Sequence, residues 1–251
     1  FVGGWYITSA TAEHKDLLEC RLVEIDGHPI AEVVERLGEI TSSDNPFGRD
    51  LGATWHLTNV DMLAGLGLVR EAEEIEVRVR PLKGGNERVV KLATAKVKRE
   101  TLLTAPDSTP GKDEALPISL RQRSRPYGHR MIGFGALYLW YDSCRDQRQG
   151  QTVAQWTKRV LKEIDTNPPE RVIIDLRRNG GGLSNLLDPM IRSLAEVRKA
   201  GKVPGGIYVL IGSNTQSAAQ RNTSSLKFTC KATLVGTPTG QGPRRFGAIQ
   251  M

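Results

Sequence analysis

The stretch Arg171–Gly182, RVIIDLRRNGGG, is the most informative part of this sequence. A short apolar run at its start predicts a buried strand, and that strand enters a loop with three consecutive glycines. The segment Ile207–Gln220, IYVLIGSNTQSAAQ, repeats the arrangement of apolar strand, polar loop and helix-like end. In a parallel sheet such loops leave the same edge, where α/β proteins place their sites. The two loops are therefore expected to lie side by side.

The second loop carries the candidate nucleophile, Ser217. A serine in the first turn of a helix has its hydroxyl near the positive end of the helix dipole. The small residue Ala218 leaves its own backbone N–H accessible, and the glycine loop offers further bare N–H groups. A hydroxyl beside such donors suits acyl transfer. The alternatives are that Ser217 is a helix N-cap, for which serine is favoured, and that the glycines only make a turn.

Three short motifs resemble those of a known family, the tail-specific (C-terminal processing) serine proteases. They are DLRRNGGG at 175–182, TQSAAQ at 215–220 and VGTPTG at 235–240. The match is best to the branch that shares the tricorn protease core, whose pattern reads approximately DLRxNxGG, TxSAA and GxPTGG. The resemblance implies a serine endopeptidase that forms an acyl-enzyme on Ser217.

The resemblance also implies roles for the neighbouring residues. The oxyanion hole would be formed by the backbone N–H groups of Ala218 and Gly181, with Gly182 the next candidate for the glycine. Substrate contacts would come from the rest of the two loops, at Gly180, Thr215 and Gln216. Asp175 and Arg177 are expected to be structural, with the aspartate fixing the loop and pairing with the arginine.

A general base for Ser217 is missing from the sequence. Many tail-specific proteases place a lysine in a Gly-Lys-Gly after the third motif, but this chain has Gln241 there, and an amide accepts no proton at neutral pH. The tricorn-like branch uses a histidine that would fall before residue 1, with an acidic partner beyond Met251. The chain is therefore expected to be truncated at both ends. It has four histidines, none in that context: His14, His28, His56 and His129. His14 and His28 are expected at the surface, and His56 and His129 are the alternative candidates for a base.

The expected fold is α/β: a crotonase/ClpP-like parallel β/α core preceded by a β-rich PDZ-like module. Residues 1–100 are assigned to the PDZ-like module, 101–130 to a proline-rich linker and 131–251 to the protease core. Residues 131–141, MIGFGALYLWY, are predicted to form one apolar strand, and residues 183–199 a long helix. Residues 42–67 are an insertion relative to the PDZ-like pattern.

Composition and charge limit the classes of partner that the chain is expected to bind. The formal net charge is +7, but the basic residues are scattered apart from Arg121–Arg130, which is read as a solvated loop because no stacking pattern accompanies it. No apolar run approaches the length of about 18 residues that a membrane span needs. Cys20, Cys144 and Cys230 fit no metal spacing, and either one disulfide or three buried thiols would suit them. We expect a peptide or protein substrate, no metal or cofactor, and a periplasmic or extracellular location by resemblance.

Two alternatives to a peptidase remain. The first is a non-catalytic relative that kept the serine and glycine loops, lost its base and binds a peptide or an apolar ligand. The second is a crotonase-type acyl-CoA enzyme, which shares the core and a backbone oxyanion site. The DLR-NGGG and SAA motifs and the PDZ-like region argue against the second alternative.

Overall fold

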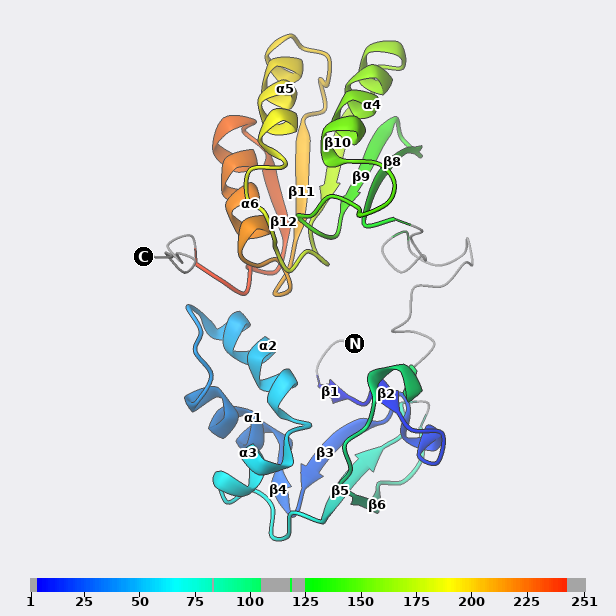
Figure 1. The fold of residues 1–251 in the computed structure, drawn as a ribbon, viewed down its shortest axis with the longest axis vertical. Coiled ribbons are helices and arrows are strands. Elements are labelled where there is room, and N and C mark those ends of the chain that lie inside the picture. The colour runs from blue at the N-terminus through cyan, green and yellow to red at the C-terminus, as the bar shows by residue number, and fades with distance from the viewer. Residues whose placement is uncertain (1–3, 83, 105–117, 119–124, 243–251) are drawn as a thin grey trace. The chain divides into compact units, whose positions relative to one another are not determined.

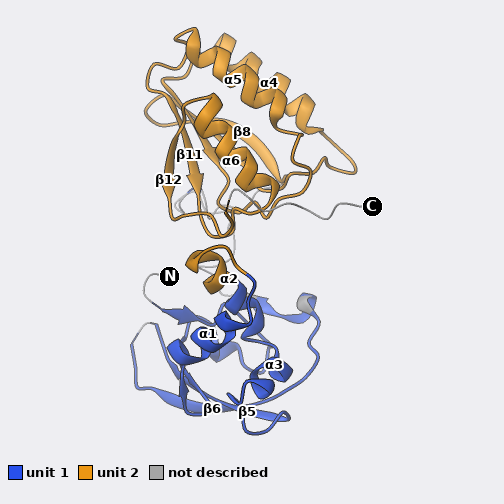
Figure 2. Ribbon diagram, turned by 90° about the vertical axis from the view of Figure 1, so that its left-hand side faces the viewer, with its two compact units in different colours: residues 1–42, 52–124 blue, residues 43–51, 125–251 orange. Residues whose placement is uncertain are grey.

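A computed structural model describes residues 4–82, 84–104, 118 and 125–242. The chain divides into two compact units, coloured separately in Figure 2. Unit 1 comprises residues 1–42 and 52–124, and unit 2 comprises residues 43–51 and 125–251. The first part of helix α2 (Pro46–His56) thus belongs to unit 2 and the rest to unit 1. Most of the predicted linker, at 105–117 and 119–124, lies outside the described residues.

Unit 1 is built on an antiparallel sheet with the strand order β1-β3-β5-β6, to which β4 adds a short pair with β3 (Figure 1). The strict alternation of EIEVRVR produces β5, which pairs with β6 along its length. A positive-φ turn at Asp26 and Gly27 reverses the chain between β3 and β4, as an Asp-Gly pair favours. The strands are β1 (Trp5–Tyr6), β3 (Arg21–Ile25), β4 (His28–Pro29), β5 (Glu74–Arg80) and β6 (Arg88–Ala93).

Helix α1 supplies much of the core of unit 1. Its apolar residues recur at helical spacing, and Val33, Val34 and Leu37 are buried. The predicted insertion at 42–67 forms two helices, and its Asn59 caps the second by accepting the Met62 N–H. The remaining elements are α1 (Ile30–Glu39), α3 (Val60–Gly65), the 3₁₀ turns η1 (Lys15–Leu17) and η2 (Arg99–Thr101), and a small pair of strands, β2 (Ser9–Ala10) and β7 (Leu103–Thr104).

Unit 2 contains a five-stranded sheet with the order β12-β11-β10-β9-β8. Strands β9 to β12 are parallel and β8 is antiparallel to β9, so the prediction of an α/β fold is confirmed. Strand β11 is IYVLI, and β10 is VII between its terminal Arg171 and Asp175, so both strands are apolar at their centres, as expected of strands in a parallel sheet. The strands are β8 (Tyr127–Ile132), β9 (Ala136–Tyr141), β10 (Arg171–Asp175), β11 (Ile207–Ile211) and β12 (Thr233–Gly236).

The prediction of a single strand over 131–141 is wrong. The chain reverses at Gly133-Phe134-Gly135, and β8 and β9 form a hairpin in which Ile132 pairs with Ala136. Phe134 and Gly135 both have positive φ, at 61° and 64°, which is the geometry of a tight hairpin turn. Gly133 and Gly135 favour a turn around Phe134, and this preference prevails over the continuous strand that the apolar run suggests.

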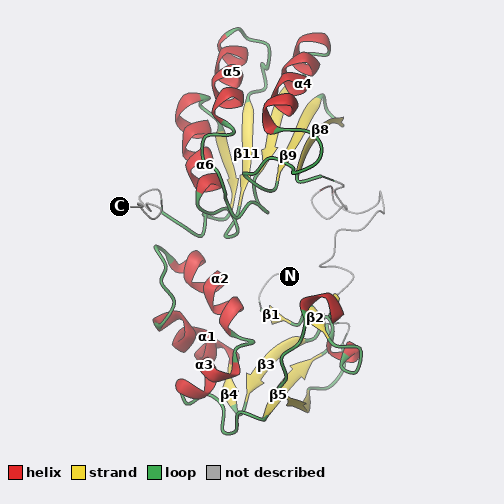
Figure 3. Cartoon of the chain, in the orientation of Figure 1, coloured by secondary structure: helices red, strands yellow, loops and turns green. Residues whose placement is uncertain are grey.

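Three helices join the parallel strands and pack in the order α4, α5, α6 (Figures 1 and 3). Each crossover steps to the next strand in the same direction, and right-handed crossovers then place all three helices on one face of the sheet. Thr152 begins α4 with a complete capping box. Helix α5 starts later than predicted, with Pro189 in its first turn. The helices are α4 (Val153–Thr166), α5 (Asp188–Lys199) and α6 (Ala218–Thr229).

The core of unit 2 lies between this sheet and its helices. Trp156 of α4 is fully buried, with its ring stacked on Tyr141 at 5.7 Å between centroids.

All three cysteines of the chain are buried thiols without a disulfide, which is the second of the two alternatives given for them above. Within the described part of the chain, no helix is both long enough and apolar enough to cross a bilayer.

Candidate active site

The three motif loops meet at one edge of the sheet of unit 2. They follow β10, β11 and β12, which are neighbouring parallel strands, so their carboxyl ends lie together. Backbone hydrogen bonds join the loops: Gln216 N–H donates to the Asn179 oxygen at 3.1 Å, and Gly240 N–H to the Ser213 oxygen at 3.1 Å. The expected juxtaposition of the glycine and serine loops is therefore present.

Ser217 occupies a strained backbone conformation at the start of α6. Its φ is 51° and its ψ is −123°, a region that residues with a Cβ rarely adopt. It stands at the N-cap position, yet its hydroxyl makes no capping hydrogen bond. The residue is exposed. A capping role therefore does not account for this serine, and its strand–turn–helix setting is that of a nucleophile elbow.

Gly181 contacts Ser217 directly. A Cβ built on Gly181, whose φ is +106°, would stand 2.6 Å from the Ser217 Cβ and 3.1 Å from its Oγ. Only a glycine lets the backbone come so close to the serine. The Gly181 N–H, however, donates to Asn179 Oδ1 at 2.9 Å. The expectation that this N–H serves the oxyanion hole does not fit the structure, because the group already has a buried acceptor.

The N–H groups of Ala218, Gly180 and Gly182 also lie in these loops and have no hydrogen-bond partner among the described residues. Ala218 N–H is the first in α6, and helix termini leave such donors unpaired. Gly182 is exposed and forms a parallel bridge with Cys144 that uses the Gly181 oxygen and the Leu183 N–H. In that pattern the groups of Gly182 itself point away from Cys144. Gly182, the next candidate after Gly181 in the sequence analysis, therefore has an N–H available to a ligand.

Asn179 holds the glycine and serine loops together, a role that the sequence analysis missed. The residue is fully buried, and its side-chain amide donates to the Tyr141 oxygen at 2.7 Å while its Oδ1 accepts from Gly181. Its backbone oxygen accepts from Gln216. The Asn in the DLRRN motif was the available signal, because an asparagine after a strand commonly fixes a turn.

Thr215 and Gln216 differ in accessibility. Thr215 is fully buried, its hydroxyl donates to the Leu176 oxygen at 2.9 Å, and it accepts the Gly212 N–H at 3.1 Å. Its expected role in substrate binding does not fit the structure, because its side chain is buried inside the loop. Gln216 and Gly180 are at least partly exposed and remain candidates for contact with a ligand.

Asp175 and Arg177 form the ion pair that the sequence predicted. Arg177 donates to the buried carboxylate through Nε at 3.0 Å, Nη2 at 2.9 Å and its backbone N–H at 3.1 Å, and Tyr138 donates its hydroxyl. Burial alone would raise the pKa of Asp175, but the hydrogen bonds from Arg177 and Tyr138 outweigh burial and hold that pKa below its usual value. The structural role predicted for both residues is confirmed.

Cys144 lies behind the glycine loop, with its thiol 3.5 Å from Asn179 Oδ1. It is fully buried, and burial raises the pKa of the thiol. Because a thiolate rather than a thiol is the nucleophile, Cys144 does not compete with Ser217 for a reactive role.

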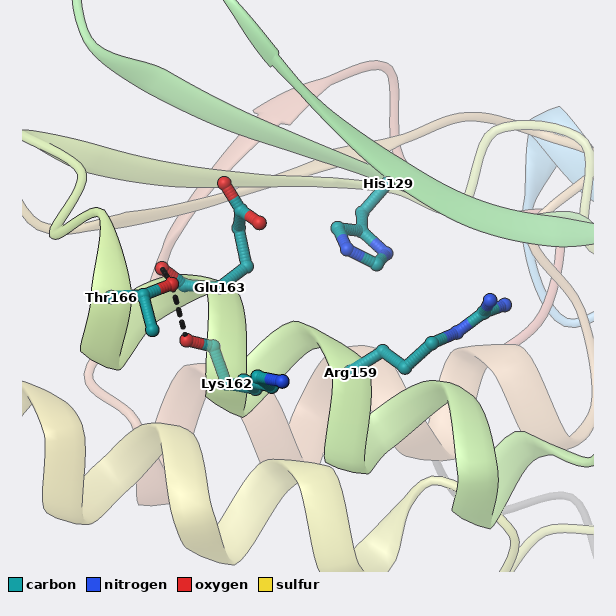
Figure 4. Close-up of a pocket in the computed structure, with 5 residues that line it drawn as sticks. All are labelled: His129, Arg159, Lys162, Glu163 and Thr166. Atoms are coloured by element: carbon teal, nitrogen blue, oxygen red, sulfur yellow. Dashed lines mark hydrogen bonds between the residues drawn. The ribbon is translucent and has the colours of Figure 1, made fainter.

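His129 is the histidine of unit 2, and it lies away from Ser217. It sits on β8, three strands from β11, which places it about 14 Å across the sheet from β11 at about 4.8 Å per strand. Its Nδ1 accepts the Trp156 Nε1–H at 3.2 Å, and burial lowers its pKa. Figure 4 shows its ring facing α4, in a pocket lined by Arg159, Lys162, Glu163 and Thr166. His129 is therefore not the base for Ser217 in this structure; His14, His28 and His56 belong to unit 1.

Gln241, in the third loop, stands beside Ser217. Its side-chain Oε1 accepts the backbone N–H of Ser217 at 2.6 Å. The sequence marked this position only as one where a lysine was absent. The described residues contain no group of three or more His, Cys, Asp or Glu side chains that could hold a metal ion.

Comparisons with known proteins connect this arrangement to solved structures. No family model matches the chain, and no curated protein matches its sequence. It is similar to mature CPAF complexed with lactacystin, at a TM-score of 0.57 and 14% identity, over 90% of this chain and 65% of that one. Mature CPAF gives a TM-score of 0.53 at 14% identity, over 88% and 63%.

The photosystem II D1 C-terminal processing protease is a more distant neighbour. Its TM-score is 0.34 at 14% identity, over 90% of this chain and 53% of that one, which is too weak a likeness to carry an argument. The chain thus spans slightly less than two thirds of the length of the CPAF structures. At these identities the comparisons establish a shared fold with CPAF, and the chemistry depends on the site itself.

Proposed function

We propose that this chain is the core of a serine peptidase of the tail-specific type, in which Ser217 forms an acyl-enzyme with a peptide substrate. The observation that carries the proposal is the strained, uncapped Ser217 in contact with Gly181 and next to the unpaired N–H of Ala218. Strain that surrounding structure maintains is concentrated at functional sites. The fold shared with CPAF agrees with the proposal.

In this proposal Ser217 Oγ attacks the carbonyl carbon of the scissile peptide. The carbonyl oxygen becomes an oxyanion and accepts hydrogen bonds from Ala218 N–H and Gly182 N–H. The C–N bond then breaks, and the amine leaves with the proton that the Ser217 hydroxyl gave up. Water hydrolyses the Ser217 ester, which releases the acid and regenerates the serine hydroxyl. Asn179 and Asp175 serve the reaction indirectly: Asn179 joins the glycine and serine loops, and Asp175 fixes the start of the glycine loop through Arg177.

We further propose the finer assignments that follow from this function. Unit 2 would be a crotonase/ClpP-like core of the tricorn-related branch, and unit 1 a PDZ-like module that presents peptide to it. A secreted or periplasmic location and a peptide or protein partner fit such an enzyme. These assignments depend on the motif resemblance described above.

A second candidate is a non-catalytic peptide- or ligand-binding relative of the same fold. One observation favours it: the amide of Gln241 lies beside Ser217, and no histidine of unit 2 is within reach. When the base of a catalytic triad is removed, only the oxyanion site and substrate binding still accelerate the reaction, and the rate falls by several orders of magnitude. We therefore expect the 251-residue chain to hydrolyse peptides poorly at best.

The test is covalent labelling of the chain by a fluorophosphonate probe, followed by mass spectrometry of the intact protein. We expect slow labelling with one equivalent of probe, and none in Ser217→Ala. Ser213→Ala, in the same loop, is the matched control and should label like the unaltered chain. A chain that labels no faster than Ser217→Ala would contradict the peptidase and favour the binding relative.

A further inference from the structure

The loop after β12 contacts the nucleophile through one side chain, Gln241. Its Oε1 accepts the N–H of Ser217 at 2.6 Å, just below the usual range of about 2.7–3.2 Å for N–H···O bonds. This N–H lies just before the first turn of α6, where the helix provides no acceptor. Gln241 therefore supplies the acceptor for the backbone N–H of Ser217, the residue with the unusual φ.

The backbone around Gln241 is itself fixed from two sides. On the side of the serine loop, Gly240 N–H donates to the Ser213 oxygen at 3.1 Å, and a Cβ on Gly240 would lie 2.3 Å from that oxygen. Within the loop, Thr239 Oγ1 donates to the Gln241 oxygen at 2.9 Å. The side chain of Gln241 thus projects from a segment with little freedom to move.

On the other side, residues 43–51 hold the same loop. Asn45 Nδ2 donates to the Thr239 oxygen at 3.0 Å, and Gly242 N–H donates to Asp44 Oδ2 at 3.0 Å. A Cβ on Gly48 would stand 2.0 Å from the Gly240 oxygen, so the start of α2 packs directly on the loop. This segment belongs to unit 2 although it lies nearly 200 residues earlier in the chain than Gln241. It is part of the stretch that the sequence marked as an insertion.

We propose that Gln241 is a positioning residue that holds the backbone of Ser217 in its strained conformation, and that Asp44 and Asn45 act through it. The inference rests on the proposed function for its catalytic meaning, but the hydrogen bond can be tested without activity. An amide carries no titratable proton at neutral pH, so Gln241 orients the serine and does not accept its proton. Its contribution is therefore independent of pH.

Gln241→Met and Gln241→Glu separate the hydrogen bond from the shape of the side chain. Methionine matches the length of glutamine but lacks the oxygen acceptor, whereas glutamate keeps an acceptor at the same place. The first measurement is the exchange rate of the Ser217 amide proton with solvent, residue by residue, by NMR. We expect exchange up to about tenfold faster in Gln241→Met, since the net free energy of such a hydrogen bond corresponds to a factor of at most about ten. Gln241→Glu should keep the slow exchange.

The second measurement is the rate of fluorophosphonate labelling at Ser217 over a range of pH. Gln241→Met should lower the rate about tenfold by the same factor at every pH, and Gln241→Glu should restore most of it. Asn45→Ala should move both readouts in the direction of Gln241→Met by a smaller factor. Thr237→Ala, in the same loop but without a contact to Ser217, is the control that should change neither.

The outcomes are distinguishable. Ser217 amide exchange that is unchanged in Gln241→Met, or equally fast in Gln241→Met and Gln241→Glu, overturns the positioning role. Slow exchange that depends on Gln241 as expected, in a chain that no probe labels, upholds the positioning role and overturns the peptidase proposal instead.

Discussion

Gly181→Ala should slow the labelling of Ser217 by at least about 100-fold, which is the cost of a displacement of about 1 Å at a reacting group. The added methyl group would stand 2.6 Å from the Ser217 Cβ and 3.1 Å from the Gln216 oxygen, so one of the two loops must move. The φ of +106° adds backbone strain for any residue with a Cβ. The rate of fluorophosphonate labelling, compared with that of the unaltered chain, measures the effect.

Gly133→Ala provides a matched control in the turn between β8 and β9, outside the three motif loops. A Cβ on Gly133 meets nothing within 4 Å, and its backbone is not in the positive-φ region. Alanine at this position should leave the labelling rate within about twofold, as surface substitutions usually do. Equal rates for Gly181→Ala and Gly133→Ala would show that the contact between Gly181 and Ser217 does not shape the site.

Asp175→Asn is expected to lower the free energy of unfolding by about 2 kcal/mol or more at neutral pH. The substitution removes a buried charge that accepts from Tyr138 and three times from Arg177, and hydrogen bonds to charged groups are worth about 1.5–3 kcal/mol each. Arg177 is 39% exposed and can be hydrated after the change, which keeps the loss below that of a fully buried pair. Urea unfolding followed by circular dichroism gives the difference.

Acid should reduce this difference. The pKa of Asp175 is lower in the folded chain than its usual value of about 3.9, so its contribution is complete well above that value. The contribution is lost as the pH falls below about 4 toward the folded pKa. The unaltered chain and Asp175→Asn should therefore converge in stability as the pH falls through this range.

Asp165→Asn is the control for the same chemical change at the surface. Asp165 pairs with Lys202 at 2.6 Å, but both side chains are about half exposed, and such pairs contribute about 0–1 kcal/mol. A loss from Asp175→Asn no larger than that from Asp165→Asn would remove Asp175 from the account of how the glycine loop is held.

The local sequence predicts the scaffold of the site well because apolar strands and glycine loops are short-range signals. The run RVIIDLR becomes β10, IYVLIG becomes β11, and their loops meet at the carboxyl edge. The Asp175–Arg177 pair follows equally from an aspartate at the end of a strand with an arginine two residues on. Each of these features depends on residues that are close together in the chain.

Other features depend on tertiary contacts that no short pattern contains. The backbone oxygen of Asn179 accepts the Gln216 N–H and so joins the glycine loop to the serine loop, which comes from a different part of the chain. Thr215 is buried, and its hydroxyl donates a hydrogen bond to the backbone oxygen of Leu176 in the glycine loop. The packing of residues 43–51 on the loop of Gln241 joins segments nearly 200 positions apart. None of these pairings leaves a periodic signal in the sequence.

The crystal structure of the chain after reaction with a fluorophosphonate tests the central claim most directly. The account predicts a phosphorus–oxygen bond to Ser217 Oγ, with the phosphoryl oxygen about 3 Å from the backbone nitrogens of both Ala218 and Gly182. Gln241 Oε1 should still accept from the Ser217 N–H. Phosphorus on another residue, or a phosphoryl oxygen that points to solvent away from both nitrogens, would contradict it.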